Sequence, residues 1–217
     1  MLLGHYGLAL ASKRAAPQTS VGQLTLAANL ADCVWPVLLL LGLERVQVVP
    51  GLMAASVFDF EWYPWSHSLV MQLALGVVVG LGFFIARRDG RSALLTGALV
   101  PSHWLLDLPF HRPDLPLWPG GPLVGFGLWN SLPITLIAEA LLFGGGVWLY
   151  VRQTTARDRI GTWALVAMVV VLSLIYLGGA FGPPPANQAA VGWSSLSLWL
   201  FVPWTYWIDR HRVVRAA

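Results

Sequence analysis

Long apolar runs separated by short polar segments make up most of this chain. A helix needs roughly 20 apolar residues to cross the hydrocarbon core of a membrane. Three runs come close to or reach this length without a charged residue, at Ser68–Ala86, Ile160–Ala180 and Val191–Ile208. Three more reach it with a single acidic residue each, at Leu24–Leu43, Ser92–Phe110 and Val124–Val151. The pattern predicts an all-α, polytopic membrane bundle of about six spans.

Shorter features predict what lies between and inside these spans. The first dozen residues are apolar but too short to cross, so we expect a half-helix or an interfacial helix there. The segment Gly182–Gln188 contains three consecutive prolines and predicts a turn, because proline cannot continue a helix. Gly144–Gly146 lies inside a predicted span, where small residues favour a close contact between helices.

Composition excludes a water-soluble globular protein. Hydrophobic residues make up 57% of the 217 residues and charged residues only 11%, whereas soluble domains are about one quarter charged. The 12 tryptophans agree with this, since tryptophan is enriched where a membrane meets water. The single cysteine, Cys33, excludes an intramolecular disulfide and a zinc site built from several cysteines.

The charge pattern predicts the orientation of the chain. A net charge of +3 on a soluble protein would suggest nucleic acid, but lysine and arginine here form short clusters between apolar runs, which is typical of cytoplasmic loops. We therefore expect no nucleic-acid partner. The clusters alternate with loops that have at most one arginine, which predicts that both termini are cytoplasmic and that Asp59–Ser66 and His111–Gly121 are outside. The expected location is the cytoplasmic (inner) membrane of a bacterium or archaeon; the oligomeric state is not predicted.

Several ionisable side chains lie within or at the ends of the apolar runs. At membrane depth each costs at least roughly 2.5–3.5 kcal/mol on insertion scales, so such groups usually face a bundle interior, a partner or a pathway. They are His5, Asp32, His67, His103, Asp107 and Glu139. His103 and Asp107 are four residues apart, so both side chains lie on one face of a helix. They can bind one divalent cation together, or form a buried hydrogen bond with each other.

The other members of this set need partners of their own. His67 stands between two serines, and Ser66 and Ser68 can orient its ring by hydrogen bonding. Asp32 lies four residues before Pro36 within a predicted span, and its partner is either a cation or its own proton. Glu139 is a candidate proton-handling residue.

Five of these residues form a ligand set suited to a divalent metal ion. They supply three imidazoles and two carboxylates, from His5, Asp32, His67, His103 and Asp107. Such ligands favour zinc, with manganese as the alternative, and they would hold one ion or two that share a carboxylate. A bound ion would lower the pKa of a water molecule and polarise a phosphoryl or acyl oxygen. Asp59 and His111 are the candidate general base and acid.

The order of the motifs resembles the LexA-regulated, inner-membrane metal-dependent hydrolase family. The matching motifs are Gly4-His5, Asp32 with Pro36, His67-Ser68, Ser102-His103 with Asp107, and Leu117-Trp118-Pro119. That family looks distantly related to the zinc-dependent phospholipase C and single-strand nuclease fold, an all-helical scaffold with His and Asp ligands. The resemblance implies that the five residues named above are metal ligands. It covers roughly residues 1–120.

The chain departs from the family's pattern at three polar positions. Val34 stands where the family has a second acid, and Trp35 stands where it has a histidine. The segment from Trp62 to Ser66 replaces the family's His-Arg-Gly-x-Thr. These departures bear on whether a site of this kind would be active.

We expect a single membrane domain with two parts. Residues 1–120 contain the metal site, with the N-terminal helix, three spans and outer loops, and residues 121–217 add further spans and a basic tail. The expected function is a membrane-bound metal-dependent hydrolase of a phosphoester or other ester at the bilayer interface, with a membrane lipid or lipid-linked phosphate as substrate. The alternatives are a transporter or proton- or cation-handling protein, in which Glu139 would face the same cavity as Asp32, and a non-catalytic protein with a vestigial metal site.

Straight spans would keep the predicted ligands apart. His5 and Asp32 lie toward the cytoplasmic ends of their segments, whereas His67, His103 and Asp107 lie toward the outer ends. If the ligands converge, a helix must be broken near Pro36, or the N-terminal segment must be re-entrant; otherwise the number of spans is wrong.

Overall fold

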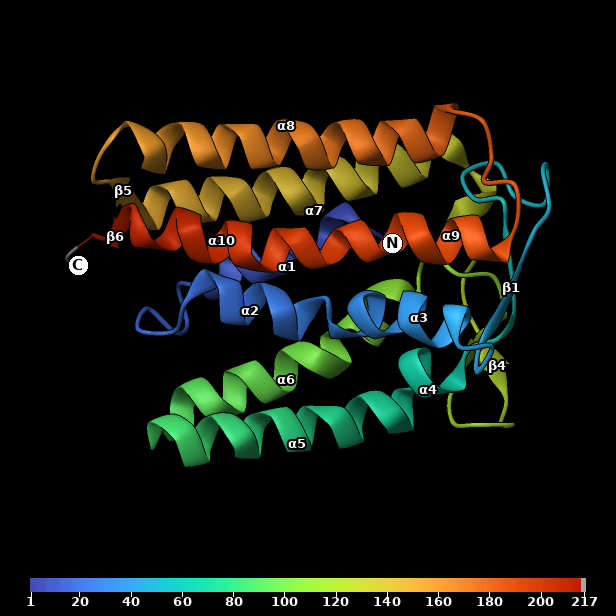
Figure 1. The fold of residues 1–217 in the computed structure, drawn as a ribbon, viewed down its shortest axis with the longest axis horizontal. Coiled ribbons are helices and arrows are strands. Elements are labelled where there is room, and N and C mark those ends of the chain that lie inside the picture. Colours follow the sequence, from blue (N-terminus) through green and yellow to red (C-terminus); the bar gives the residue numbers. More distant parts are fainter. Residues whose placement is uncertain (216–217) are drawn as a thin grey trace.

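The computed structural model describes residues 1–215 as a bundle of helices that run along one common axis (Figure 1). The longer helices are α1 (Leu3–Ser12), α2 (Val21–Ala28), α3 (Leu30–Leu40), α5 (Leu69–Arg87), α6 (Gly90–Asp107), α7 (Leu132–Gln153), α8 (Arg159–Phe181), α9 (Gln188–Ser195) and α10 (Phe201–Arg210). The short helix α4 (Pro64–His67) precedes α5, and the 3-10 helices η1 (Leu128–Asn130) and η2 (Leu196–Leu200) precede α7 and α10. In Figure 1, α7 and α8 lie on one side of the bundle, α5 and α6 on the other, and the remaining helices between them.

Within residues 1–215, three helices are long and apolar enough to cross a membrane: α5, α7 and α8. The pair α2 and α3 qualifies as one span if it is counted across its 54° bend. Helix α5 shows the surface expected of a span, because Val77, Val78 and Ile85 are exposed and only Gln72 and Gly76 are buried. The protein is therefore mostly helical and suited to membrane association.

Six spans are not confirmed, and each difference has a physical reason. Ser92–Phe110 forms α6, but this helix carries several polar residues and does not reach the hydropathy of a span. Val191–Ile208 is divided among α9, η2 and α10, so no α-helix there is long enough. The predicted run Val124–Val151 begins as a helix only at Leu132, because a short strand and η1 occupy its first residues.

Short antiparallel hairpins modify the predicted all-α fold. Strand β1 (Arg45–Val48) pairs with β2 (Phe58–Trp62), β3 (Leu115–Pro116) with β4 (Leu123–Val124), and β5 (Thr154–Ala156) with β6 (Arg212–Val214). The labelled strands β1 and β4 lie at one end of the bundle in Figure 1, and β5 and β6 lie at the other. The connection between α8 and α9, with its three prolines, is a turn as predicted.

Glycines bring two pairs of helices into close contact. Gly7 of α1 lies against the backbone of α7, and a Cβ atom on Gly146 would collide with the carbonyl oxygen of Gly7. Gly144 and Gly145 have open space beside them, so the predicted close contact is made by Gly146 alone among the three. Gly76 of α5 and Gly97 of α6 form a similar contact, with each Cβ position within 3 Å of the other's carbonyl oxygen.

The N-terminal run is a buried half-helix and not an interfacial one. Tyr6 and Leu10 of α1 are buried in a core with Phe143 of α7, Met168 of α8 and Phe201 at the start of α10. Because α1 belongs to the first predicted part and α7 to the second, the two parts share this core. The packing holds α1 in the middle of the bundle, where its first turn carries His5.

Candidate metal centre

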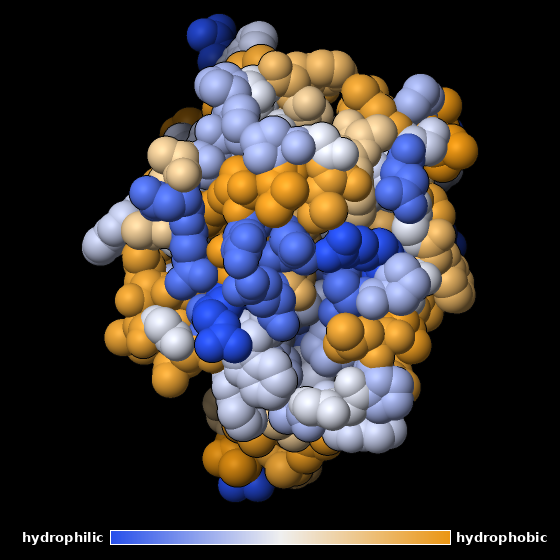
Figure 2. All heavy atoms as spheres, turned by 90° about the vertical axis from the view of Figure 1, so that its right-hand side faces the viewer, coloured by the Kyte–Doolittle hydropathy of each residue, from blue (hydrophilic) through white to orange (hydrophobic). Residues whose placement is uncertain are grey.

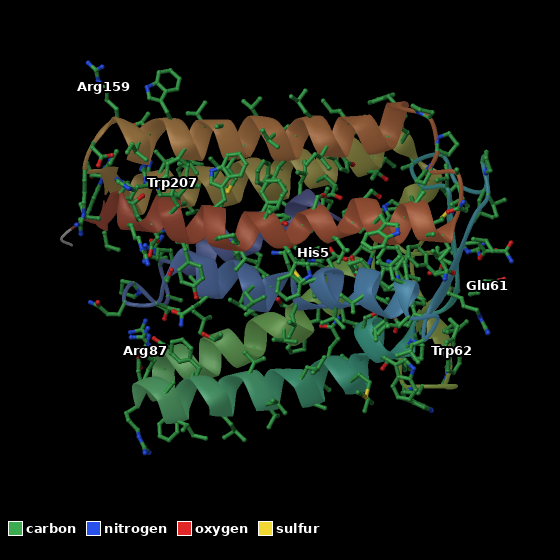
Figure 3. All side chains as sticks on the ribbon, viewed as in Figure 1. His5, Glu61, Trp62, Arg87, Arg159 and Trp207 are labelled. Atoms are coloured by element: carbon green, nitrogen blue, oxygen red, sulfur yellow. The ribbon has the colours of Figure 1, made fainter. Side chains whose placement is uncertain are left out.

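Four helices bring the predicted ligands together inside the bundle. The contributing elements are α1 (His5), α3 (Asp32), α4 (His67) and α6 (His103 and Asp107). Figure 3 shows His5 in the interior, between the end marked by Arg87 and Arg159 and the end marked by Glu61 and Trp62. Ligand atoms of two overlapping groups lie within 4.8 Å of one another; one group is His5, His103 and Asp107, and the other is Asp32, His67 and His103.

Asp107 is at the centre of the first group. Its Oδ1 lies 3.2 Å from His5 Nε2 and 2.5 Å from the amino group of Met1. Its Oδ2 lies 3.2 Å from His103 Nε2 and 3.9 Å from His111 Nε2. The rings of His5 and His103 stack with their centroids 3.6 Å apart. His111 follows Pro109, and a turn after α6 brings its ring to the same centre.

Asp32 joins the second group and is the most accessible of the five residues. Its Oδ1 lies 3.6 Å from His67 Nε2 and 3.7 Å from His103 Nε2. Its side chain is 15% exposed, whereas those of His67 and His103 are 5% and 1% exposed. Anything that approaches the centre from outside would therefore meet Asp32 first.

The helix is broken at Asn29 and not near Pro36, which lies inside α3. The Asn29 side-chain amide donates to the Thr25 carbonyl, 2.9 Å away, at the end of α2. The bend turns Asp32 into the bundle. It also leaves the Ala28 carbonyl free to accept a hydrogen bond from His103 Nδ1, at 2.9 Å. One break thus positions a carboxylate and orients an imidazole.

Hydrogen bonds on Nδ1 direct the Nε2 atoms of two histidines into the centre. His103 donates through Nδ1 to Ala28, as above. His67 Nδ1 lies 2.7 Å from Ser66 Oγ, which donates its own proton to Glu44 Oε2 at 2.6 Å and therefore accepts from the ring. Glu44 is fully buried and also accepts from the Ser66 backbone amide, at 2.9 Å; burial raises the pKa of its carboxyl group. Such outer hydrogen bonds fix the tautomer of metal-binding histidines.

With these tautomers, the Nε2 atoms of His103 and His67 are hydrogen-bond acceptors, and each faces a carboxylate oxygen, which is also an acceptor. Among the described residues, His103 Nε2 is buried without a hydrogen-bond partner although Asp107 Oδ2 is 3.2 Å away. His67 Nε2 lies 3.6 Å from Oδ1 of Asp32, which is partly exposed to the cavity. For the buried pair of His103 and Asp107, lone pairs opposed at this distance are favourable only with a cation or a proton between them. The residues present therefore fit a divalent ion.

The two candidate proton-transfer residues occupy different positions. His111 is buried beside the ligands, and its Nδ1 lies 2.9 Å from Asp114 Oδ1 and 3.3 Å from the Tyr63 hydroxyl. Burial lowers the pKa of His111 and so favours the neutral ring. Asp59 is one third exposed on β2 and pairs with Arg112, which also donates to Asp114. The structure therefore brings His111 to the centre, whereas Asp59 reaches His111 only through Arg112 and Asp114, by three successive contacts.

Glu139 contacts the beginning of α1. Its two carboxylate oxygens accept from the backbone amides of Leu2 and Gly4, each at 2.8 Å. The first amides of a helix lack partners within the helix, and no side chain within α1 caps them. Glu139 lines the same cavity as Asp32, as the transport alternative predicts, but both of its oxygens are occupied by this capping.

A cavity of about 520 Å³ opens above the ligands. Its polar floor includes Asp32, His67, Asp107, His111 and Glu139, and its walls include the aromatic residues Trp35, Phe58, Phe60, Trp129 and Tyr176. Trp35, at a position that is polar in the resembling family, packs edge-on against His67. Figure 2 shows the end of the molecule that carries β1 and β4, where hydrophilic residues gather across the middle with hydrophobic surface above and to both sides.

Three residues of this site were missed by the sequence interpretation: Glu44, Tyr63 and Asp114. Ser66 was predicted to orient the ring of His67 and does so, whereas Ser68 caps α5 through Met71 N. Asp114 follows His111 by three residues, which is a local signal that could have been recognised. Glu44 is 22 residues from Ser66, and no spacing rule connects them.

Comparisons with models of known protein families, with curated proteins and with solved structures find no match to this chain.

Proposed function

We propose that this protein is a membrane-bound, metal-dependent hydrolase that acts on a phosphoester or other ester at the bilayer interface. The observation that carries the proposal is the buried pair of opposed acceptors, His103 Nε2 and Asp107 Oδ2, with His67 Nε2 and the partly exposed Asp32 beside it. The order of motifs that resembles the LexA-regulated hydrolase family supports the same proposal. The departures at Val34 and Trp35 are compensated in our proposal by His111, which lies at the ligands.

One ion is favoured over two by the chemistry of His103. Its Nδ1 is committed to Ala28, so it offers only Nε2. Both candidate groups include this atom, and one nitrogen lone pair binds one ion. Without a shared carboxylate, a second ion would have only two protein ligands, fewer than the three or four of most zinc sites. Imidazole and carboxylate ligands favour zinc, with manganese as the alternative.

The chain's own residues divide the remaining work. The bound ion would supply Lewis-acid polarisation of a phosphoryl or acyl oxygen. His111, neutral and held by Asp114, is placed to take a proton from an attacking water molecule and return it to the leaving group. The aromatic walls exclude bulk water, which strengthens electrostatic interactions at the floor. Asp59 acts in our proposal only through Arg112 and Asp114.

The substrate class follows from where the site lies. The cavity adjoins α8, which is long and apolar enough to span a membrane. We propose a membrane lipid or a lipid-linked phosphate as the substrate. We also propose the cytoplasmic membrane as the location, with the end marked by Arg87 and Arg159 facing the cytoplasm.

A second candidate function is proton or cation handling. It is favoured by one observation, the shared cavity of Asp32 and Glu139. Hydrolysis also explains the hydrogen bonds that orient the rings of His67, His103 and His111. The capping of α1 gives Glu139 a structural role. In the cation-handling case, ion flux into liposomes would depend on Asp32 and no ester would be cleaved.

Metal content tests the proposal directly. We expect the purified protein to contain about one divalent ion per chain by elemental mass spectrometry. A His103→Ala, Asp107→Ala double variant should insert normally and lose the ion. The matched control is a His211→Ala, Asp158→Ala variant, which removes a His–Asp pair at the surface and should retain the ion. Equal metal content in all three proteins would overturn the proposal.

A further inference from the structure

The cavity above the metal centre extends sideways to the surface of the bundle. One of its walls is the last part of α8, including Ile175, Gly179 and Ala180. The opposite wall is the junction of α9 and η2, including Ser195 and Leu198. Helix α8 is one of the membrane-suited helices, and its last turns form this side of the cavity, whereas Phe58 and Phe60 of strand β2 line another side.

The opening exists because α8 and α9 are held by different neighbours. Trp204 Nε1 of α10 donates to the Ala164 carbonyl of α8, at 3.1 Å, in the half of α8 far from the centre. Near the centre, α9 and η2 pack against α3, where Trp199 Nε1 donates to the Cys33 carbonyl at 2.8 Å. Gln188 of α9 also donates to Leu39, at 3.1 Å. The cavity lies between these two sets of contacts and is lined by residues from both α8 and α9.

The walls of the opening suit an alkyl chain. Ile175, Tyr176 and Ala180 of α8 and Leu198 of η2 line it. Two of the three serines of α9 and η2 that line the cavity already donate within the chain, Ser194 Oγ to the Val191 carbonyl at 3.1 Å and Ser197 Oγ to the Ser194 carbonyl at 2.7 Å. A polar floor joined to an apolar side exit matches a molecule with a polar head and a hydrocarbon tail.

We infer that the site takes an amphiphile directly from the bilayer: its ester or phosphoester head lies at the histidine and aspartate cluster, and its alkyl chain leaves between α8 and α9. The reaction named in this inference rests on the proposed function. The binding of the alkyl chain rests on the cavity alone. Gly179 is the specificity-determining position. It lines the exit, and a Cβ atom added there has no other atom within 4 Å.

The adjacent glycines Gly179 and Gly178 allow a variant that blocks the exit and a matched control variant. Gly178 also has open space beside it but does not line the cavity, because successive residues of a helix are rotated by about 100°. Gly179→Trp should therefore fill the exit without disturbing the fold, and Gly178→Trp should add the same side chain to the surface outside it.

The binding experiment uses a dodecyl phosphate with a photoactivatable diazirine in its chain, added to protein in phosphatidylcholine nanodiscs. We expect labelled peptides from the end of α8 and from α9 and η2, with labelling suppressed by excess unlabelled dodecyl phosphate. Gly179→Trp should reduce this labelling about tenfold, the loss expected when two or more methylene groups can no longer be buried. Gly178→Trp should label like the wild type.

Activity on two substrates separates this inference from the proposed function. Gly179→Trp should lose cleavage of a long-chain phosphoester and retain cleavage of water-soluble 4-nitrophenyl phosphate. Equal loss or equal retention of both would overturn the chain exit while leaving the hydrolase in place. Specific labelling without cleavage of either ester would support the exit and refute the hydrolase. Labelling that is insensitive to Gly179→Trp, or chain-to-chain crosslinks that show a second copy covering the exit, would overturn the inference.

Discussion

The surroundings of one nitrogen atom, His103 Nε2, show that the side chains of the predicted ligands are held in fixed orientations. His103 Nε2 lies between two carboxylates, 3.2 Å from Asp107 and 3.7 Å from Asp32, and its ring cannot rotate without losing the bond to Ala28. His67 is held in the same manner by Ser66 and Glu44. The imidazoles are thus oriented before any ion arrives, which reduces the entropy lost on binding.

The Ser66 hydroxyl is predicted to control metal affinity without touching the metal. Ser66→Ala removes the acceptor of His67 Nδ1 and leaves buried Glu44 with one hydrogen bond fewer. Loss of an outer hydrogen bond of this kind typically weakens metal binding by about 10–100-fold. Competition with a chromophoric chelator measures the change.

Ser102→Ala is the matched control for this prediction. Ser102 stands next to His103 but donates only to the Leu99 carbonyl within α6, at 2.6 Å. Its metal affinity should remain within a few-fold of the wild type. If the Ser66 and Ser102 variants bind the ion equally well, His67 is not oriented by Ser66 or is not a ligand.

Sequence reasoning succeeded at residue scale where the relation was local. The i, i+4 spacing of His103 and Asp107 and the neighbour relation of Ser66 and His67 both describe contacts that the structure contains. Glu44 was beyond its reach, because its contact with Ser66 depends on how the β1–β2 hairpin returns the chain. Residue type and spacing therefore predicted the clustered histidines and aspartates better than the groups that hold them.

At the scale of elements, one helix pair determines where His5 lies. The contact of Gly7 with Gly146 sets the distance between α1 and α7, and the cap from Glu139 sets the position of α1 along that contact. His5 is two residues before Gly7. A small displacement of α1 would therefore move one ligand away from four that belong to other helices.

Gly146→Ala is predicted to destabilise the protein and to weaken metal binding together. The added methyl group meets the carbonyl oxygen of Gly7, a backbone atom that cannot move alone. Overpacking of this kind typically costs about 1–3 kcal/mol. Thermal unfolding in nanodiscs and metal content measure the two effects.

Gly145→Ala tests the same helix without the contact. Gly145 has open space beside it, and alanine favours a helix over glycine by up to about 1 kcal/mol, so this variant should unfold at an equal or higher temperature and retain its ion. A Gly146→Ala protein with unchanged stability would mean that α1 does not pack on α7 in this register.

The sequence did not predict where helices begin and end within the apolar runs. Asp32 and Asp107 were read as acids inside spans, but Asp32 follows a break at Asn29 and Asp107 is the last residue of α6. Both carboxylates lie where the regular structure bends or stops. An apolar run cannot reveal such a break, because Asn29 is a single residue whose side chain bonds back to Thr25.

On the scale of the whole molecule, the two ends of the bundle differ in the residues that they expose. Arg87 and Arg159 mark one end, and Glu61 and Trp62 mark the end whose hairpins cover the site (Figure 3). The positive-inside tendency predicts that the arginine end faces the cytoplasm. The cavity would then open near the outer leaflet.

Cysteine labelling in intact cells tests this orientation. Glu61→Cys should react with a membrane-impermeant maleimide, and Arg159→Cys should react only after the cells are permeabilised, since both positions are exposed at opposite ends. Buried Cys33 is an internal control that should stay unlabelled in both cases. The reverse pattern would place the site near the inner leaflet and leave its chemistry unchanged.

The apolar exit between α8 and α9 also affects how the protein should be handled outside the cell. On our inference, a detergent with one alkyl chain would occupy the same cavity as the proposed substrate, so the agent that extracts the protein would compete with that substrate. Bilayer-like particles free of such molecules would leave the cavity to lipid, and ester cleavage measured in micelles is expected to be slower than in a membrane.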